Sequence, residues 1–250
     1  MIDVWIDVFC LPLILLSAQL LAAFAIVPMR IDRQAKFMLL FGLTYFAVGL
    51  VFCHWFLGYR ELSWRDIGFN TSGLAGLAAT GLGAGVFCVA MFCGFHYLFH
   101  FLKIDTSNTD RKLKELVGDT PQSMYAFMLV AILGGGILEE VMFRGIMITR
   151  LLALAGPDPG IKATAWIIAI PSLLFGAAHY PMMGLPGFIV TAVAGAVLGG
   201  LFLTTGNLFP VMLAHVLVNG IMVYFIYYGV LDFAGRECQK TDDRHPDSDN

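Results

Sequence analysis

Long runs of apolar residues set the strongest limit on how this chain can fold. A helix needs about 20 consecutive apolar residues to cross the ~30 Å hydrocarbon core of a bilayer. The sequence contains seven runs that approach or exceed this length, at residues 4–27, 37–57, 74–101, 125–154, 164–180, 188–204 and 208–230. We therefore expect an all-α fold, a polytopic membrane bundle of about seven transmembrane helices, within a range of six to eight.

The composition supports this class and leaves room for one domain. Of the 250 residues, 58% are hydrophobic and only 13% are charged, whereas about 25% are charged in a typical soluble domain. We expect a single membrane-embedded domain over residues 1–235 and a disordered tail over residues 236–250, which are almost without apolar side chains. No cluster of basic residues suggests a nucleic-acid partner.

The charges between the apolar runs predict an orientation. The N-terminus lacks the basic region of a signal peptide, and the run behind it is long enough to span the membrane, so we expect it to stay in the protein. With the N-terminus outside, ten Lys and Arg residues fall on the cytoplasmic side and four on the other. The excess of basic residues on the cytoplasmic side of membrane proteins favours this arrangement, with the C-terminus in the cytoplasm and the protein in the cell membrane.

Three ionisable residues interrupt the fourth apolar run. Glu139, Glu140 and Arg144 lie within six residues, and each would cost about 2.5 to 3.5 kcal/mol alone at the centre of a bilayer. Glu140 and Arg144 are spaced i,i+4 with the acid first, which is the favourable order for an ion pair on one helix face. The spacing predicts a Glu140–Arg144 pair and leaves Glu139 for chemistry, although an ion network that only fastens the bundle remains the alternative.

Two later runs carry further polar residues at helical spacing. Phe175 and His179 are i,i+4, with small residues between them that allow another helix to approach. His215 and Asn219 are also i,i+4, so both point to the same side of an otherwise apolar helix. Hydrogen bonds between helices are the structural alternative for these side chains.

Together these groups are the ingredients of hydrolysis by water. A desolvated glutamate beside a histidine can take a proton from water and return it to a leaving amine. Histidine and asparagine side chains can donate hydrogen bonds to the oxyanion that forms when water attacks an amide carbonyl. Neither Gly-x-Ser-x-Gly nor His-Glu-x-x-His occurs in the sequence.

The order and spacing of these residues resemble the CPBP family of intramembrane proteases, which includes the CAAX prenyl endopeptidases and the bacterial bacteriocin-processing and immunity (Abi) proteins. The resemblance covers about residues 125–228. It rests on three motifs, Glu139-Glu140-x-x-x-Arg144, Phe175-x-x-x-His179 and His215-x-x-x-Asn219.

The resemblance implies a role for each motif residue. Glu139 and His179 would activate the water, and His215 and Asn219 would form the oxyanion site. Glu140, Arg144 and Phe175 would support these groups. No cofactor is expected. Zinc held by Glu139, His179 and His215 is a minority alternative, which the poor ligand Asn219 and the lack of ligand-type spacing disfavour.

We therefore expect an intramembrane endopeptidase that cleaves a peptide or membrane-protein substrate near the cytoplasmic face of the bilayer. Two other classes stay open. One is a non-catalytic scaffold or immunity protein that retains the fold. The other is a proton-coupled transporter, for which intramembrane Glu and His are also natural; the absence of a recognisable inverted repeat counts against it.

Overall fold

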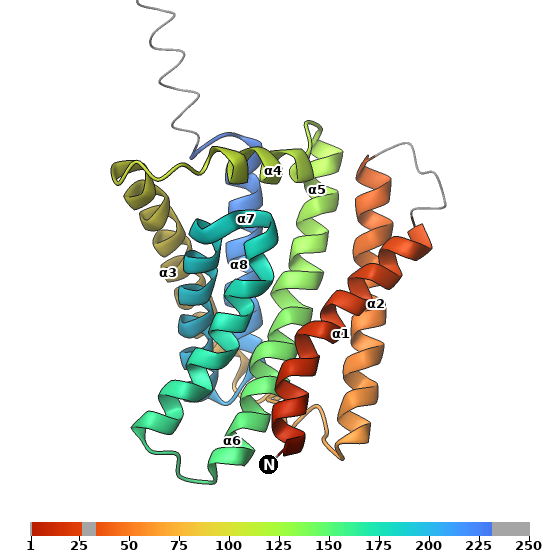
Figure 1. Cartoon of the computed structure of the whole chain (residues 1–250), viewed down its shortest axis with the longest axis vertical. Coiled ribbons are helices and arrows are strands. Elements are labelled where there is room, and N and C mark those ends of the chain that lie inside the picture. The colour runs from red at the N-terminus through yellow and green to blue at the C-terminus, as the bar shows by residue number, and fades with distance from the viewer. Residues whose placement is uncertain (1, 27–33, 232–250) are drawn as a thin grey trace, which may run out of the picture.

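The computed structural model describes residues 2–26 and 34–231, and this part of the chain is helical and contains no strand. The helices are α1 (Ile2–Ile26), α2 (Gln34–Tyr59), α3 (Leu74–Phe101), α4 (Ser107–Val117), α5 (Pro121–Val130), η2 (Ala131–Glu139), η3 (Val141–Ile148), α6 (Thr149–Ala155), α7 (Ile161–Thr205) and α8 (Leu208–Tyr227). Helices α5 to α6 follow one another as a single long helix over residues 121–155. Figure 1 shows the long helices packed side by side as a bundle.

Six of the described helical stretches are long and apolar enough to cross a membrane. The fifth, α7, is a hairpin of two segments. It reverses at Gly184, whose φ of 62° and ψ of −163° are open to glycine because it has no Cβ. A Cβ on Gly195 would lie 3.0 Å from Ser172 Cα, and one on Gly176 would lie 2.8 Å from Phe188 O, so the two segments pack closely and antiparallel. The predicted runs 164–180 and 188–204 correspond to these two segments.

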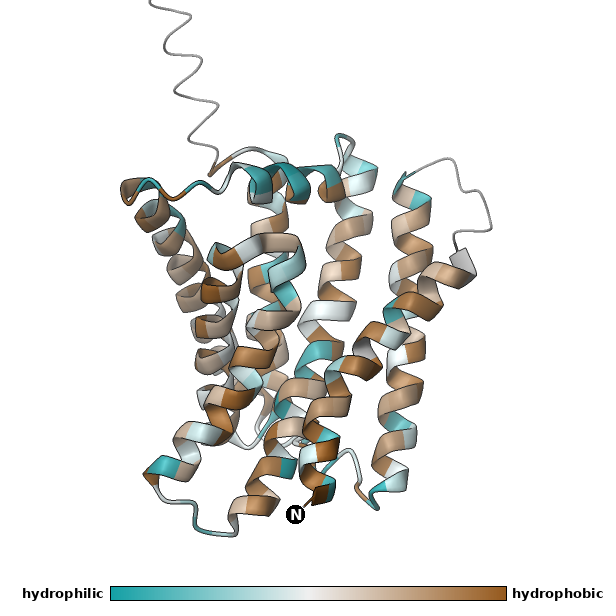
Figure 2. Cartoon of the chain, viewed as in Figure 1, coloured by the Kyte–Doolittle hydropathy of each residue, from teal (hydrophilic) through white to brown (hydrophobic). Residues whose placement is uncertain are grey.

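The outer surface of the bundle is apolar. Large side chains such as Val51, Phe87 and Trp166 are 58–68% exposed, and Figure 2 shows hydrophobic residues along the lengths of the long helices. A continuous apolar surface of this extent is typical of contact with lipid. The helical bundle and this surface together confirm the prediction of a polytopic membrane protein.

Helix α4 lies across one end of the bundle, the end where α8 finishes and α7 turns back (Figure 1). It forms most of the polar connection between the third and fourth apolar runs and is hydrophilic in Figure 2. Thr109 Oγ1 donates to Met183 O at 2.9 Å, and Gln34 Nε2 donates to Glu115 O at 2.8 Å. These bonds attach α4 to the turn of α7 and to the start of α2.

The opposite end is held by a buried carboxylate that the sequence interpretation did not single out. Asp7 on α1 is 2% exposed. It accepts hydrogen bonds from Arg60 Nε at 3.0 Å and from Arg150 Nε at 2.9 Å. Because Arg60 directly follows α2 and Arg150 belongs to α6, the cluster fixes α1 against α2 and against the helix that carries the central motif.

Candidate functional site

The helix that carries the central motif departs from the regular α-helix that we expected. Residues 131–139 and 141–148 are π-helical, with hydrogen bonds from residue i to i+5. π-Helical turns are rare and occur frequently at functional sites. Three consecutive glycines, residues 134–136, lie within this region. A Cβ on Gly134 would lie 2.8 Å from Tyr45, one on Gly135 2.6 Å from Asn219, and one on Gly136 2.6 Å from Val216. These glycines allow α2 and α8 to approach closely.

Glu140 is the centre of a buried charged cluster. Its Oε1 accepts from Arg144 at 2.7 Å, so the ion pair predicted from the spacing is present. The same oxygen accepts from His215 Nδ1 at 2.6 Å, a contact that the sequence interpretation missed because the partners lie 75 residues apart. Glu140 and Arg144 are 0% and 1% exposed. Arg144 also donates to Gly195 O at 3.3 Å.

The bond to Glu140 fixes the direction of the His215 ring. Because Nδ1 bonds to Glu140, Nε2 points to the other side of the ring. There it lies 3.7 Å from the position that a Cβ on Gly135 would take. The same position is 3.7 Å from Glu139 Oε2 and 2.6 Å from Asn219 Nδ2. Three of the predicted groups, contributed by η2 and α8, therefore converge over Gly135. Gly135 was not predicted to be part of the site. The sequence feature that could have indicated it is the run of three glycines shortly before the two glutamates.

The groups around Gly135 differ in their hydrogen bonding. Asn219 Nδ2 donates to Ala131 O at 2.7 Å, which orients the amide. Glu139 Oε2 is buried and makes no hydrogen bond with the described residues. A buried carboxylate oxygen without a partner is unusual, and here it faces the ring of His215 and the amide of Asn219.

His179 and Phe175 lie on the first segment of α7. His179 Nδ1 is hydrogen-bonded to Phe175 O at 2.9 Å, which leaves Nε2 available. The Phe175 ring lies 4.6 Å from the His179 ring, 5.8 Å from the His215 ring and 4.7 Å from the Arg144 guanidinium carbon. Phe175 thus contacts both histidine rings and packs on the charged cluster. The described hydrogen bonds do not join His179 to Glu139 directly.

Within residues 2–26 and 34–231, no three His, Cys, Asp or Glu side chains come together in a way that could hold a metal ion. The zinc alternative named Glu139, His179 and His215; of these, His179 and His215 both contact the Phe175 ring, at 4.6 and 5.8 Å between ring centroids.

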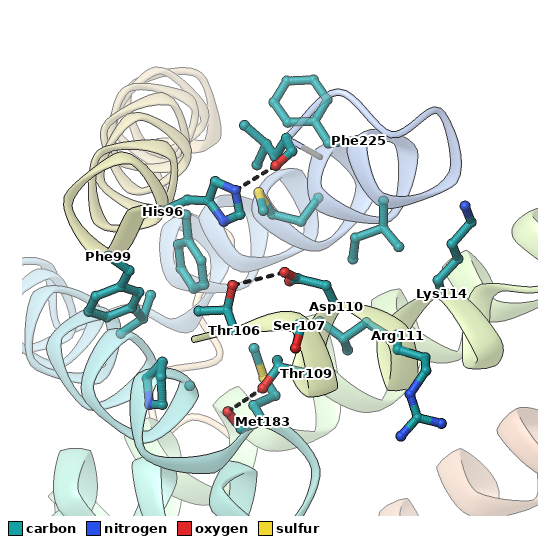
Figure 3. A pocket seen from close by; sticks show the side chains of 18 of the residues that line it. His96, Phe99, Thr106, Ser107, Thr109, Asp110, Arg111, Lys114, Met183 and Phe225 are labelled. Atoms are coloured by element: carbon teal, nitrogen blue, oxygen red, sulfur yellow. Dashed lines mark hydrogen bonds between the residues drawn. The ribbon is translucent and has the colours of Figure 1, made fainter. Parts of the chain in front are cut away.

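A cavity of about 450 Å³ lies between α3, α4, the turn of α7 and α8. Figure 3 shows Phe99 and Phe225 at this cavity, with Asp110 and Lys114 projecting from α4. Met222 also lines it, three residues after Asn219 on α8. The cavity is therefore largely apolar, and its polar side chains are His96 on α3 and those along and just before α4. The sequence interpretation gave no indication of it, because its walls come from four separate helices.

Comparison with protein families matches residues 121–221 to the family described as type II CAAX prenyl endopeptidase Rce1-like. No curated protein and no solved structure matches the chain. The matched segment contains all three motifs and lies within the predicted protease core, residues 125–228, apart from its first four residues. The resemblance inferred from the motifs is confirmed over residues 121–221, which match the Rce1-like type II CAAX prenyl endopeptidase family.

Proposed function

We propose that this protein is an intramembrane endopeptidase in which Glu139 and His179 activate a water, and His215 and Asn219 stabilise the oxyanion. The observation that carries the proposal is the convergence over Gly135. An unpartnered carboxylate oxygen lies there beside one histidine nitrogen and one amide nitrogen. A base and hydrogen-bond donors around one small space are what amide hydrolysis requires.

The proposed reaction follows from these positions. Glu139 takes a proton from water as the water oxygen bonds to the carbonyl carbon, and the carbonyl electron pair moves onto its oxygen. Asn219 Nδ2 and the protonated Nε2 of His215 donate to that oxyanion. The C–N bond then breaks, and the amine leaves with the proton held by Glu139. His179, with Nδ1 occupied by Phe175 O, assists through Nε2.

Glu140, Arg144 and Phe175 have supporting roles in this proposal. Glu140 holds His215 by Nδ1, so that Nε2 faces the substrate. Arg144 compensates the charge of Glu140, and the Phe175 ring fixes the separation of the two histidines. The same carboxylate therefore serves both the ion pair and the oxyanion site.

We propose that the cavity receives the apolar part of the substrate. On α8, His215, Asn219, Met222 and Ile226 follow a spacing of three or four residues and share one helix face, and Met222 and Ile226 line the cavity. A substrate could thus extend from the cavity along α8 to the site. The name of the matched family refers to prenyl substrates, and an apolar cavity suits a prenylated peptide or another apolar peptide segment.

The cavity and α4 lie at the end of the bundle that the distribution of basic residues assigns to the cytoplasm. We propose that α8 ends on the cytoplasmic side, that the N-terminus lies outside the cell membrane, and that cleavage takes place near the cytoplasmic face. Of the described residues on connections, Lys103, Arg111, Lys112 and Lys114 belong to this end.

The function can be tested without knowing the substrate. Membranes that contain the wild-type protein or the His179→Ala variant are incubated, and new peptide termini are identified by mass spectrometry. We expect termini that depend on His179 and that still form with a metal chelator present, because the proposed base is a carboxylate. Identical termini in both samples would reject the endopeptidase, and loss on chelation that added zinc reverses would reject the metal-free mechanism.

Gly135→Ala should lower kcat by about 10- to 100-fold with little loss of expression. The added Cβ would lie 2.6 Å from Asn219 Nδ2, so it displaces the amide from the oxyanion position, and one oxyanion donor is worth about 10²- to 10³-fold in kcat when it is lost completely. Gly94→Ala on α3 is the matched control, since a Cβ there meets nothing within 4 Å. Equal rates for the two variants would argue against an oxyanion site at Asn219.

A further inference from the structure

Tyr45 brings α2 into the candidate site. It lies outside the segment 121–221 that matches the protease family. Its side chain is 4% exposed and stacks on Phe41 with 6.2 Å between the ring centroids. The ring fills the space left by Gly134, where a Cβ would lie 2.8 Å from Tyr45 Cε1. The phenol is thus fixed against the π-helix one residue from Gly135.

The Tyr45 hydroxyl and the Glu139 carboxylate share an unusual property. Among the described residues, the buried side-chain oxygens or nitrogens without a hydrogen-bond partner are Tyr45 Oη, Glu139 Oε2 and Glu140 Oε2. Tyr45 and Glu139 also interact electrostatically, and the Gln19 side chain of α1 is a polar neighbour that can donate to the Tyr45 hydroxyl oxygen. Buried polar groups are nearly always satisfied. Glu139 Oε2 has no partner among the described residues, and a tyrosine hydroxyl beside one donor still has a second lone pair, so both oxygens have capacity for a shared group.

We propose that Tyr45 Oη and Glu139 Oε2 together bind the attacking water, so that Tyr45 is a further catalytic residue. This inference rests on the proposed endopeptidase function. A direct hydrogen bond between the two oxygens is not formed, whereas one water can bridge polar groups that are too far apart to bond directly. Glu139 Oε2 also faces His215 and Asn219 across Gly135, which places this water beside the oxyanion donors.

The chemistry of the bridge suits a nucleophile. The water donates one hydrogen to Glu139 and the other to Tyr45 Oη, since a phenolic oxygen is an acceptor as well as a donor. A lone pair of the water then remains for the carbonyl carbon. As Glu139 removes the first proton, the second stays on the oxygen that becomes part of the new carboxyl group. Tyr45 orients the water and does not change its own protonation.

The test is Tyr45→Phe, which keeps the ring and removes only the hydroxyl. Rates are measured in proteoliposomes with a fluorogenic peptide that carries the cleavage sequence found by mass spectrometry. We expect kcat to fall about tenfold with KM unchanged, the size expected for one lost hydrogen bond. Tyr125→Phe on α5, where the side chain is 63% exposed, is the matched control and should keep the wild-type rate.

A double-variant cycle separates a shared water from a structural effect. The Glu139→Asp variant keeps a carboxylate base on a shorter side chain, so the water bridge to Tyr45 is already broken in it. Tyr45→Phe should then slow Glu139→Asp by less than twofold, because effects on one shared water are not additive. A full tenfold effect in both backgrounds would overturn the shared water, and a wild-type rate for Tyr45→Phe would overturn any role of the hydroxyl.

If Tyr45→Phe melts at a lower temperature, Gly134→Ala provides a second measurement. Its Cβ displaces the Tyr45 ring but leaves the hydroxyl in the protein. We expect kcat to fall in Gly134→Ala and to fall no further when Tyr45→Phe is added; independent losses would contradict the inference. A wild-type protein that cleaves no peptide, or cleaves equally without Glu139, would instead reject the proposed function and this inference with it.

Discussion

Glu139→Gln is expected to reduce kcat by about 10²- to 10⁴-fold, the usual contribution of general acid and base catalysis. Glutamine has the shape of glutamate but cannot take a proton from water. Because Glu139 Oε2 makes no hydrogen bond with the described residues, its replacement breaks no bond that holds the fold. The melting temperature in detergent and the yield of protein in the membrane should therefore stay near wild type, while the reporter peptide is no longer cleaved.

The matched control is Glu61→Gln, which changes an exposed carboxylate at the far end of α2 and should leave the rate unchanged. Retained cleavage in Glu139→Gln would reject Glu139 as the base. If Glu139→Gln instead restores the wild-type phenotype to cells that lack the protein, the non-catalytic scaffold becomes the better-supported function. Solute uptake into proteoliposomes that survives the loss of both Glu139 and His179 would identify the transporter.

Arg144→Ala is expected to destabilise the protein by about 3–5 kcal/mol, the range measured when one partner of a buried ion pair is removed. The guanidinium is 1% exposed, and it contacts Glu140 at 2.7 Å, Gly195 O at 3.3 Å and the Phe175 ring at 4.7 Å. Alanine leaves Glu140 buried without its cation. We expect lower yield in the membrane and a lower melting temperature. Arg111→Ala, which removes an exposed arginine on α4, should have no such effect.

The double variant Glu140→Gln with Arg144→Met distinguishes the two roles of Glu140. Replacing a buried ion pair by groups of similar volume is often nearly neutral for stability. The double variant should therefore melt close to the wild-type temperature and well above Arg144→Ala. Cleavage should stay impaired, because glutamine offers no carboxylate to hold His215 Nδ1 and so to direct Nε2 to the substrate. Recovery of both properties would limit Glu140 to the ion pair. An unchanged melting temperature in Arg144→Ala would reject the structural role of the pair.

The sequence was sufficient for the class of protein and for the ion pair within the candidate site. Apolar runs of membrane-spanning length predict helices because an unpaired peptide group is too costly in lipid. The Glu140–Arg144 pair followed from spacing along one helix, since residues four apart are neighbours whatever the rest of the fold does. The turn inside α7 was also predictable, because it falls in the segment with Pro181, Gly184 and Pro186 between two apolar runs.

Contacts between helices could not be predicted in this way. His215 Nδ1 bonds to Glu140, Tyr45 reaches Gly134, and the cavity forms beneath α4 only after helices distant in sequence have packed together. The π-helical geometry of residues 131–148 has no signal in residue spacing.

The amino-acid sequence by itself thus determined which side chains are polar inside the membrane and which of them share a helix face. Both properties depend on local spacing and on the cost of placing charge in lipid. The tertiary structure decided which partner each polar group meets. It paired Glu140 with Arg144 and His215, and it left Glu139 Oε2 without a hydrogen bond to the described residues. Such pairings depend on how closely small residues allow separate helices to approach.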